Sequence, residues 1–551
     1  MEIEDILKEA IRDAASSAIK DGVFPDGELA EVELSVPPKK EFGDYATNFA
    51  MQSARTFHMN PRKIAEEISS RITGDWLDHI QIAGPGFLNF YLKTDVLYDS
   101  FRKALEKGDA YGNLPHKDTE RIMVEYVSAN PTGLLHVGHG RGAAAGSALV
   151  NLLRAAGYPV YSEYYINDAG SQIDNLAASV NARYLELLGE QAVFPENGYH
   201  GKDIIDTAKR IISKDGDKYL HMQESERLKI FKELALKEKL KALREDLEEF
   251  NVTFDNWFSE RTLHPNMVRD AVEELKANGN IYEEKGALWL RSTKYGDDKD
   301  RVVIRDNGVP TYLAADIAYH KNKFDRGFGR LINIWGADHH GYVCRVKAAM
   351  KALGYEPDKL EIKLLQMVSL FRGGELVKMS KRTGTSVTLE ELIDEVGTDA
   401  ARYFFLMRSL DSQLDFDLDL AKSHSNDNPV YYIQYAHARI MSVFRQAAEE
   451  HILEGDAPKL ELLTDESEKK LIKKILSYEQ EIEKAAADCA PHHIARFAYD
   501  IASDFHSFYS RCRIIGVDEE LASARLALLR GTAHVIEHAL GILGVSAPDK
   551  M

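Results

Sequence analysis

The sequence predicts an α/β fold: a central parallel β-sheet carrying a helical insertion, an N-terminal α+β domain and a C-terminal all-α domain. Strand-like runs alternate with helix-like runs from Arg121 onward, which is typical of βαβ units. The first 112 residues combine one amphipathic helix with short alternating strand patterns. Helical periodicity then dominates from about Ala421 to Met551. The predicted domains are therefore 1–112, 113–420 and 421–551.

Composition indicates a soluble protein of several domains. The 551 residues, 44% of them hydrophobic, suffice for three or four domains of about 150 residues. We find no apolar run of the roughly 18–20 residues that span a bilayer and no signal-peptide pattern, so we expect a cytoplasmic protein without a membrane partner. Three scattered cysteines predict neither disulfides nor a thiolate metal site. The net charge of −19 argues against coating nucleic acid through bulk charge, but it allows a local basic groove.

The N-terminal domain is expected to contain a helix followed by strands. The acidic stretch at residues 1–22 has the spacing of an amphipathic helix. "AEVELSVPP" predicts one strand, and "IQIAGPGFLNFYL" predicts two strands joined at its Pro-Gly turn. A charged, turn-rich stretch then predicts a linker to the central domain.

The central domain has the alternation of a Rossmann-type parallel sheet. Its predicted strands and helices are "RIMVEYV", "AAAGSALVNLLRAAG" and "YPVYSEYYI" in one half, then "RLINIWGAD", "VCRVKAAMKALG" and "EIKLLQMVSL" in the other. A polar, mostly helical insertion is predicted between the halves, at about 183–299. Ligands of such sheets bind beyond the carboxyl ends of the strands, so functional residues are expected there.

Two histidines lie three residues apart just after the first strand, in "SANPTGLLHVGHGRG". His136 and His139 are expected at a helix N-terminus, whose free N–H groups favour phosphate. A metal site is an alternative, but it needs further ligands, and a structural role for both imidazoles is another. Gly138 leaves room for a nucleotide, as Gly140 and Gly142 are also expected to do.

A second stretch, "GGELVKMSKRTGTSVTLEEL", places lysines on a Gly-flanked loop at about 373–386. Taken alone, Lys378 and Lys381 indicate no more than a solvated basic loop. Late in the same α/β segment, and beside Ser380, they suit a mobile clamp on polyphosphate.

"HVGH" and "KMSKR" resemble the paired HIGH and KMSKS motifs of class I aminoacyl-tRNA synthetases, and the chain resembles the arginyl branch in detail. The stretches "EFGDYATNFAM", "EYYINDAG", "FDNWFSE", "PTYLAADIAYH" and "WGADHHGY" occur in that family's order. One departure is Leu134, where the family often has proline. The resemblance implies catalytic roles for His136, His139, Lys378 and Lys381, and an ATP site of His136, Gly138, His139, Lys378, Met379, Ser380 and Lys381.

Recognition of arginine makes a checkable demand, because a planar guanidinium with five donors needs carboxylates as acceptors. Tyr312 and Asp316 lie four residues apart and share one face of a predicted helix. By resemblance, Glu125, Tyr312 and Asp316 hold the side chain, and Ser128 and Asn130 lie near the α-amino and carboxylate groups. Asp338 and His339 are expected in the same wall, by the same resemblance.

The resemblance implies that L-arginine reacts with ATP to give arginyl-adenylate and pyrophosphate, and that arginine is then transferred to the 3′ end of tRNA(Arg), releasing AMP. ATP would act with Mg²⁺, without a tightly bound cofactor or a protein metal site. The C-terminal domain resembles an anticodon-binding domain, in which Tyr435, His437 and Arg439 are candidate tRNA contacts. The N-terminal domain is implied to contact tRNA as well. We expect a monomer and no editing site.

Two other functions fit part of the pattern. A nucleotidyltransferase also uses an H-x-G-H turn on ATP phosphates, although such enzymes are usually shorter and lack the lysine loop and the helical tail. A catalytically inactive synthetase-like RNA-binding protein is the second alternative, which the intact histidines and lysines argue against.

Overall fold

The computed structural model describes residues 3–35, 37, 42–377, 386–452, 454–455 and 457–551. The chain folds into two compact units. The first comprises Met1–Tyr111, Ser442–Tyr478 and Asp504–His534, and the second comprises Gly112–Met441, Glu479–Ser503 and Val535–Met551. The lysine loop candidates Lys378, Met379, Ser380 and Lys381 lie outside the described residues.

The N-terminal part of the first unit is an α+β arrangement. Its strands pair antiparallel in the order β1-β3-β2. The elements are α1 (Ile3–Lys20), β1 (Tyr45–Thr47), α2 (Phe49–Gln52), α3 (Ala54–Phe57), α4 (Pro61–Arg71), β2 (Leu77–Ala83) and β3 (Phe87–Leu92). The predicted hairpin is confirmed, with Gly84 and Gly86 at positive φ in its turn. The strand predicted at "AEVELSVPP" is wrong, because the described residues of that stretch form an isolated bridge at Ser35 and no named strand.

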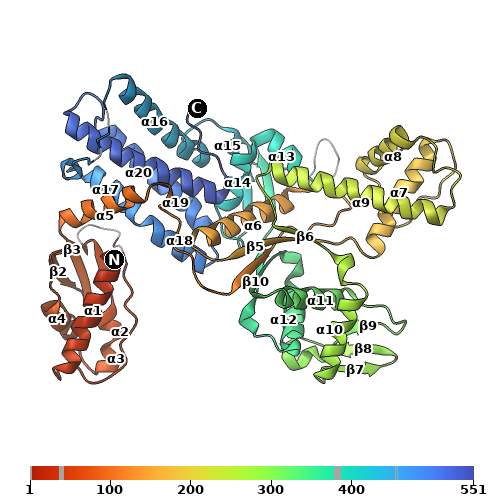
Figure 1. Cartoon of the computed structure of the whole chain (residues 1–551), viewed down its shortest axis with the longest axis horizontal. Helices are drawn as coiled ribbons and strands as arrows, with labels where there is room; N and C mark the ends of the chain where they lie inside the picture. The colour runs from red at the N-terminus through yellow and green to blue at the C-terminus, as the bar shows by residue number, and fades with distance from the viewer. Residues whose placement is uncertain (1–2, 36, 38–41, 378–385, 453, 456) are drawn as a thin grey trace. The chain divides into compact units, whose positions relative to one another are not determined.

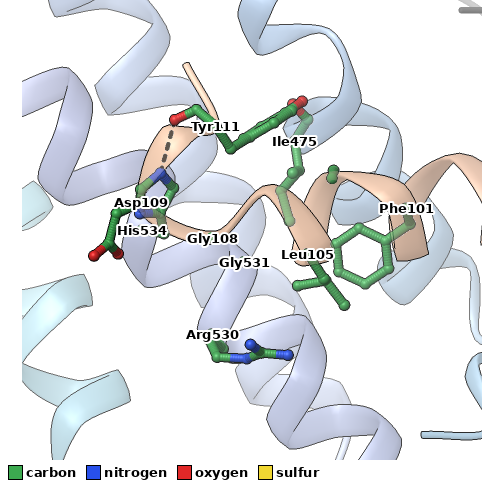
Figure 2. Close-up of a pocket in the computed structure, with 10 residues that line it drawn as sticks. Phe101, Leu105, Gly108, Asp109, Tyr111, Ile475, Arg530, Gly531 and His534 are labelled. Carbon is green, nitrogen blue, oxygen red and sulfur yellow. Dashed lines mark hydrogen bonds between the residues drawn. The ribbon is translucent and has the colours of Figure 1, made fainter. Parts of the chain in front are cut away.

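Helix α5 (Thr94–Lys107) packs in the same unit against C-terminal segments. The Tyr98 hydroxyl donates to the carbonyl of Leu463 at 2.7 Å, and the His534 Nε2 atom lies 2.8 Å from the Tyr111 carbonyl. A cavity of about 110 Å³ remains there, with Phe101 and Arg530 among its lining residues (Figure 2). The structure thus groups part of 421–551 with the first 111 residues, where the sequence suggested separate domains.

The second unit is built on a five-stranded sheet, which confirms the Rossmann-type prediction (Figure 1). The strands are β4 (Arg121–Glu125), β5 (Val160–Ile166), β6 (Asn256–Ser259), β10 (Phe328–Gly336) and β11 (Leu360–Leu365). Their order is β11-β10-β4-β5-β6, and every neighbouring pair is parallel. The order reverses between β10 and β4, and ligands of open parallel sheets bind at such a point.

Helices cover both faces of this sheet. From β4 the chain passes through α6 to β5, and from β10 through α12 to β11 on the other side of the switch. Right-handed crossovers in opposite directions place α6 and α12 on opposite faces. The helices are α6 (Val137–Ala155), α11 (Tyr312–Asp325) and α12 (His340–Leu353). Met123, Leu331, Ile317 and Val346 meet in a core that joins β4 and β10 to α11 and α12.

The interval 183–299 is not a continuous helical insertion. Three helices, α7 (Ser171–Leu187), α8 (Lys202–Asp215) and α9 (Glu224–Glu249), are followed by β6 of the main sheet. Next come α10 (Asn266–Ala277) and a small antiparallel sheet of β7 (Ile281–Glu284), β8 (Ala287–Leu290) and β9 (Arg301–Ile304). Four-residue strands are too short for their periodicity to stand out from helical sequence, which explains the difference.

After β11, a smaller sheet and several helices complete the second unit. The elements are β12 (Val368–Arg372), β13 (Glu375–Leu376), α13 (Leu389–Val396), α14 (Thr398–Leu406), β14 (Leu414–Asp417) and α15 (Leu418–Lys422). The predicted strand "EIKLLQMVSL" is in fact divided between β11 and β12. The C-terminal helices, confirmed as predicted, are α16 (Pro429–Glu449), α17 (Glu466–Leu476), α18 (Tyr478–Ala487), α19 (His492–Arg511) and α20 (Glu519–Leu543).

Helix α20 differs from the expectation that no segment has the length and composition to span a bilayer. Across the described residues it is the one helix long and apolar enough to cross a membrane by length and composition. Of its most apolar window, 67% is buried inside the structure, as in the core helix of a folded bundle.

Candidate active site

A row of polar residues crosses the central sheet, from the inner part of β10 through the carboxyl end of β4 and the middle of β5 to the first residue of β6. Asn333 on β10 is the register partner of Glu125 on β4, which is partnered by Glu163 on β5, which is partnered by Asn256 on β6. Glu125 is 6% exposed, and Glu163 and Asn333 are fully buried. Buried carboxylates are costly unless they are paired, so this row requires partners from the neighbouring helix.

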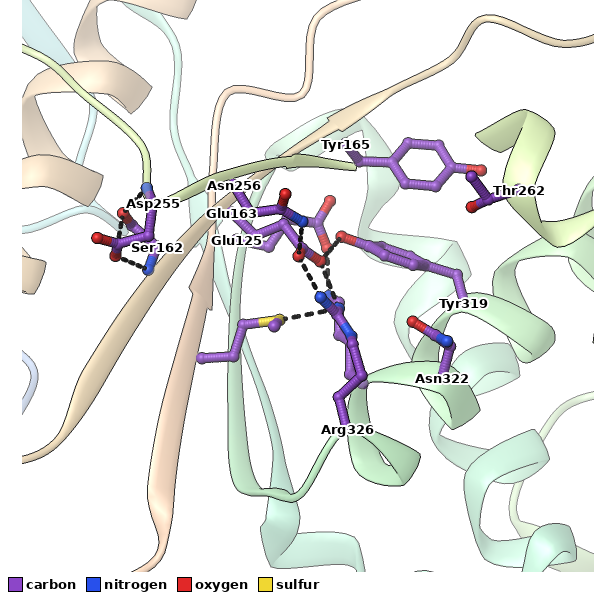
Figure 3. Close-up of polar contacts among 12 residues, drawn as sticks. Glu125, Ser162, Glu163, Tyr165, Asp255, Asn256, Thr262, Tyr319, Asn322 and Arg326 are labelled. Atoms are coloured by element: carbon purple, nitrogen blue, oxygen red, sulfur yellow. Dashed lines mark hydrogen bonds and ion pairs between the residues drawn. The ribbon is translucent and has the colours of Figure 1, made fainter. Parts of the chain in front are cut away.

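Helix α11 supplies those partners (Figure 3). The Lys323 Nζ atom lies 2.6 Å from Glu125 Oε2, and the Arg326 guanidinium donates to both oxygens of Glu163 at 2.6 and 2.7 Å. The Tyr319 hydroxyl also donates to Glu163, at 2.8 Å. Burial alone would raise the pKa of Glu163, but the hydrogen bonds from Arg326 and Asn256 and the charges of Lys323 and Arg326 together outweigh it and hold that pKa below its usual value.

A second group of carboxyls, Asp316 and Glu260, lies next to this row, and the His264 Nε2 atom lies 3.4 Å from Glu260 Oε1. Asp316, also on α11, accepts a hydrogen bond from the Tyr342 hydroxyl. Burial, followed by the neighbouring charges of Glu125 and Glu260, raises the pKa of Asp316 to about 7. Burial also raises the pKa of Glu260, which is 6% exposed. Several buried acids that destabilise one another in this way form a site for a cation.

Glu260 and Tyr342 were not predicted from the residues themselves. Glu260 lies in η3 (Glu260–Leu263), directly after β6, and the sequence placed that stretch inside an insertion. Tyr342 lies at the start of α12. The signal that points to both is their position just beyond a strand of the parallel sheet. For Tyr342 that strand, β10, was predicted, whereas for Glu260 the signal becomes visible only once β6 is recognised.

The predicted arginine-site residues are brought together only in part. Ser128 donates to Glu125 Oε1 at 3.0 Å and accepts from the Tyr165 amide at 3.1 Å, so it lies in the polar row's network. Tyr312 begins α11 one turn before Asp316 and is 58% exposed. Asn130 is exposed in the turn after β4.

Glu125 differs most from its expected role. Its carboxylate is already engaged by Lys323 and Ser128, whereas the prediction assigned it to the guanidinium of arginine. The backbone beside it is unusual, because Val127 and Ser128 have φ of 64° and 41°. Such φ values are strained for non-glycine residues and are typical of sites where the chain is held in a functional turn.

Asp338 and His339 follow β10 in η5 (Ala337–His339), and both are exposed. The His339 Nε2 atom lies 3.6 Å from Asp338 Oδ2. The indole ring of Trp335 lies near both His339 and Tyr342, with its centroid 6.2 Å from the His339 ring and 6.1 Å from the Tyr342 ring. Asp338 and His339 therefore lie at the exposed carboxyl end of β10.

The two histidines cap helix α6 and each other. His136 Nδ1 accepts from the amides of Gly138 at 3.1 Å and His139 at 3.4 Å, and His139 Nδ1 accepts from the His136 amide at 3.3 Å. Their rings stack 3.7 Å apart. A nitrogen that accepts from an amide carries no proton, so in the neutral rings the proton lies on Nε2. Burial lowers the pKa of both, to about 4 for His139, so they are neutral donors near pH 7.

The chain on both sides of the undescribed lysine segment is anchored. Thr388 forms a bridge with His136, the Val137 amide donates to the Val387 carbonyl, and the Leu389 amide donates to the Leu135 carbonyl at 2.8 Å. Buried Arg141 of α6 donates to the carbonyls of Gln366 and Ser409, both at 2.9 Å. The segment after residue 385 therefore begins beside the histidine turn.

The glycines of this stretch have different neighbours from those expected. A Cβ on Gly140 would lie 2.8 Å from Leu389 Cδ1, and one on Gly142 would lie 3.4 Å from Leu365 Cδ2. The expectation that these two let a nucleotide approach is wrong, because both face protein side chains. A Cβ on Gly138 would lie 3.0 Å from Cε1 of the His136 ring, and its role at the nucleotide stays a prediction.

Of the C-terminal tRNA candidates, two lie together. The Tyr431 and Tyr435 rings are stacked 6.0 Å apart, and the Arg439 guanidinium lies 4.5 Å from the Tyr435 ring centre. His437, in contrast, is 3% exposed, with Nδ1 3.1 Å from the Pro548 carbonyl. His437 therefore packs within the protein.

Searching the described residues finds no group of three or more His, Cys, Asp or Glu side chains arranged to hold a metal ion.

Three family models together match most of the chain. Residues 101–408 match "tRNA synthetases class I (R), catalytic domain", residues 1–92 match "Arginyl tRNA synthetase N terminal domain", and residues 433–551 match "DALR anticodon binding domain". An arginine–tRNA ligase of Carboxydothermus hydrogenoformans is 52% identical over 97% of each chain. The arginine–tRNA ligase of Bacillus subtilis is 50% identical over 100% of this chain and 99% of its own. The solved arginyl-tRNA synthetase of Thermus thermophilus, 23% identical, shares the fold with a TM-score of 0.78 over 100% of both chains.

The parallel sheet, the histidine turn at its switch point and the catalytic-domain match define a class I aminoacyl-tRNA synthetase. Within that class, the chain belongs to the arginyl-tRNA synthetase family.

Proposed function

We propose that this site carries out the arginine–tRNA ligase reaction. A carboxylate oxygen of L-arginine attacks the α-phosphorus of ATP, and the bond between that phosphorus and the oxygen bridging to the β-phosphate breaks. The products are arginyl-adenylate and pyrophosphate. A ribose hydroxyl at the 3′ end of tRNA(Arg) then attacks the arginyl carbonyl, and AMP leaves. The observation that carries this proposal is that Asp316 lies among two further acids, Glu125 and Glu260, an arrangement that suits a cationic side chain.

In this proposal the guanidinium of arginine binds Asp316 and Glu260, with Tyr342 holding Asp316 in place. A buried forked cation that meets carboxylates makes strong, directional hydrogen bonds. Tyr312, Ser128 and Asn130 would contact the rest of the amino acid, with Asp338 and His339 at the rim. Glu125 would influence arginine binding through its negative charge beside Asp316.

ATP is proposed to bind at the start of α6. His136 and His139 present neutral Nε2–H donors to phosphate oxygens, and Gly138 leaves room for the ribose and base. Lys378, Met379, Ser380 and Lys381 would approach from the loop whose end is anchored beside His136. Mg²⁺ would arrive with the phosphates of ATP, for which we assign no protein ligands. No covalent protein intermediate is required, so catalysis rests on alignment and charge stabilisation.

The partners follow from the family. The enzyme would use tRNA(Arg), arginine and ATP, with Tyr435 and Arg439 at the tRNA surface of the C-terminal helices and the N-terminal domain as a further tRNA contact. We propose a cytoplasmic monomer, which light scattering of the purified protein tests.

The pocket also accounts for specificity without editing. Citrulline, lysine and ornithine leave buried carboxylate acceptors unpaired, and sites that demand hydrogen bonds discriminate by roughly 10⁴-fold or more. Helices α7 to α9 and the β7-β8-β9 sheet then need no hydrolytic role. Rapid release of misacylated tRNA by the isolated enzyme contradicts this part of the proposal.

ATP–pyrophosphate exchange tests the function directly. Exchange is measured with each amino acid in turn, with and without tRNA, and arginine alone is expected to support it. Family membership already sets aside the nucleotidyltransferase alternative. If no amino acid supports exchange when tRNA is present, the chain is the catalytically inactive RNA-binding alternative.

A further inference from the structure

Two buried carboxylates lie side by side in the polar row. Glu125 and Glu163 are register partners on adjacent parallel strands, whose backbones lie about 4.8 Å apart. Two buried negative charges at that separation repel each other unless each has its own cation. The structure provides two, one per carboxylate: Lys323 for Glu125 and Arg326 for Glu163.

Lys323 also begins a chain of hydrogen bonds that returns to its own helix. Its Nζ atom donates to Asn333 Oδ1 at 3.1 Å, and the Asn333 amide nitrogen lies 2.7 Å from His320 Nε2. His320 Nδ1 lies 2.8 Å from the Asp316 carbonyl. A carbonyl only accepts, so Nδ1 donates and Nε2 accepts from Asn333, which gives one consistent neutral tautomer. Burial, followed by the charge of Lys323, lowers the pKa of His320 to about 3, in agreement with that neutral state.

None of these three side chains is placed to touch a substrate. Lys323 and Asn333 are fully buried and His320 is 2% exposed. Their bonds connect Glu125 on the sheet with the backbone of Asp316 on α11. A buried hydrogen-bonded network of this kind restricts geometry, because moving one group breaks the bonds of its neighbours.

We propose that Lys323 is a positioning residue for arginine recognition. It fixes Glu125 on the sheet, and through Asn333 and His320 it holds the turn of α11 that carries Asp316. This inference rests on the proposed function, because the pocket it shapes is the one assigned to arginine.

Lys323 also acts on Asp316 through its charge. The groups that influence Asp316 come from every element around it: the acids Glu125 and Glu260, the hydroxyl of Tyr342, and Lys323. The phenol of Tyr165 lies among the same acids, and burial, followed by their charges, raises its pKa. The positive charge of Lys323 lowers the pKa of Asp316, so its removal leaves the carboxyl harder to ionise.

The test compares Lys323→Met with Lys321→Met. Met keeps the length of the side chain and removes the charge. Lys321 lies on the same helix and pairs with Asp325 at 2.9 Å and Glu274 at 3.3 Å, away from the network. Initial rates of tRNA-dependent ATP–pyrophosphate exchange are measured against arginine, against ATP, and from pH 6 to 9.

Lys323→Met is expected to raise the KM for arginine by on the order of 10- to 100-fold, because small displacements of a positioned group have effects of that size. The KM for ATP should stay unchanged, and the midpoint of the arginine pH profile should move to higher pH. Lys321→Met should match the unmodified enzyme in all three. An unchanged arginine KM and pH midpoint in folded Lys323→Met overturn the proposal, as does an equal rise in both KM values.

If Lys323→Met fails to fold, Asn333→Leu carries the same test, because it keeps the Lys323–Glu125 pair and breaks the link to His320. It should raise the arginine KM and leave the ATP KM unchanged, and an unchanged arginine KM overturns the proposal. Failure of the underlying function is distinguishable, because in that case the unmodified enzyme shows no arginine-dependent exchange.

Discussion

At the residue scale, the histidine turn illustrates how backbone contacts define side-chain chemistry. The Nδ1 atoms of His136 and His139 accept hydrogen bonds from amides at the start of α6, which leaves one donor, Nε2–H, on each ring. Burial keeps both rings neutral. They therefore act on phosphate as hydrogen-bond donors and not as cations.

The neutral state of the two histidines predicts how the rate of adenylate formation depends on pH. Raising the pH from 6.5 to 8 should not slow adenylate formation through loss of a histidine charge, because the rings are neutral throughout. His139→Asn should lower kcat by about 100-fold, the usual size for one donor that meets developing charge. Single-turnover measurement of adenylate at several pH values checks both. A rate that falls along a histidine titration in the unmodified enzyme contradicts the neutral assignment.

Asp316 should titrate in the working range. Its pKa is raised to about 7, and a guanidinium binds the ionised carboxylate better. Arginine affinity should therefore rise as the pH increases through 7 and level off above it, with close to tenfold per unit at the steepest. The Kd for arginine between pH 5.5 and 8.5 measures this, and Asp316→Asn should bind weakly without that slope. A flat profile in the unmodified enzyme removes Asp316 from the guanidinium site.

At the element scale, helix α6 depends on a glycine that the sequence analysis did not single out. A Cβ on Gly146 would overlap the ring of Tyr126, whereas one on Gly142 would make an ordinary contact with Leu365. Close approach of α6 to β4 therefore requires glycine at one position and tolerates alanine at the other.

The two positions form a matched pair for a stability test. Gly146→Ala should destabilise the protein by about 1–3 kcal/mol through overpacking. Gly142→Ala should be neutral or more stable by up to about 1 kcal/mol, since alanine favours a helix over glycine. Thermal unfolding of both variants compares them. Equal melting temperatures argue against this packing of α6.

Elements with strong periodicity could be predicted, and those fixed by tertiary contacts could not. The runs around β4, α6, β5 and β10 are long and apolar, so their type follows from the sequence. Strand β6 has four residues and is held by pairing with β5, and that pairing is not visible in a single sequence. Missing β6 also hid Glu260, which follows it. The partners of Glu125 and Glu163 were missed because Lys323 and Arg326 read as ordinary surface charges of a helix.

At the scale of the whole molecule, the predicted domains are correct in class, while the structure groups their residues differently. Residues before 112 share a compact unit with parts of α16, α17, α19 and α20. Each of those segments reads as an amphipathic helix, and periodicity does not say which surface it packs against.

The C-terminal helices should act on tRNA and not on arginine. Arg439→Ala removes the guanidinium 4.5 Å from the Tyr435 ring. It should raise the KM for tRNA and leave the KM for arginine unchanged, and it should reduce the salt dependence of tRNA binding by about one charge. Aminoacylation at several salt concentrations measures both. An arginine KM that changes instead would move Arg439 out of the RNA surface.

The central claim is that buried carboxylates around Asp316 select a guanidinium. Competition between arginine and citrulline tests it most directly, because the two differ little in shape and citrulline lacks the charge and donors of the guanidinium. The measured quantity is the ratio of kcat/KM for the two amino acids in charging of tRNA(Arg). The account predicts a preference for arginine of about 10⁴-fold or more, and a ratio below about 100-fold would contradict it.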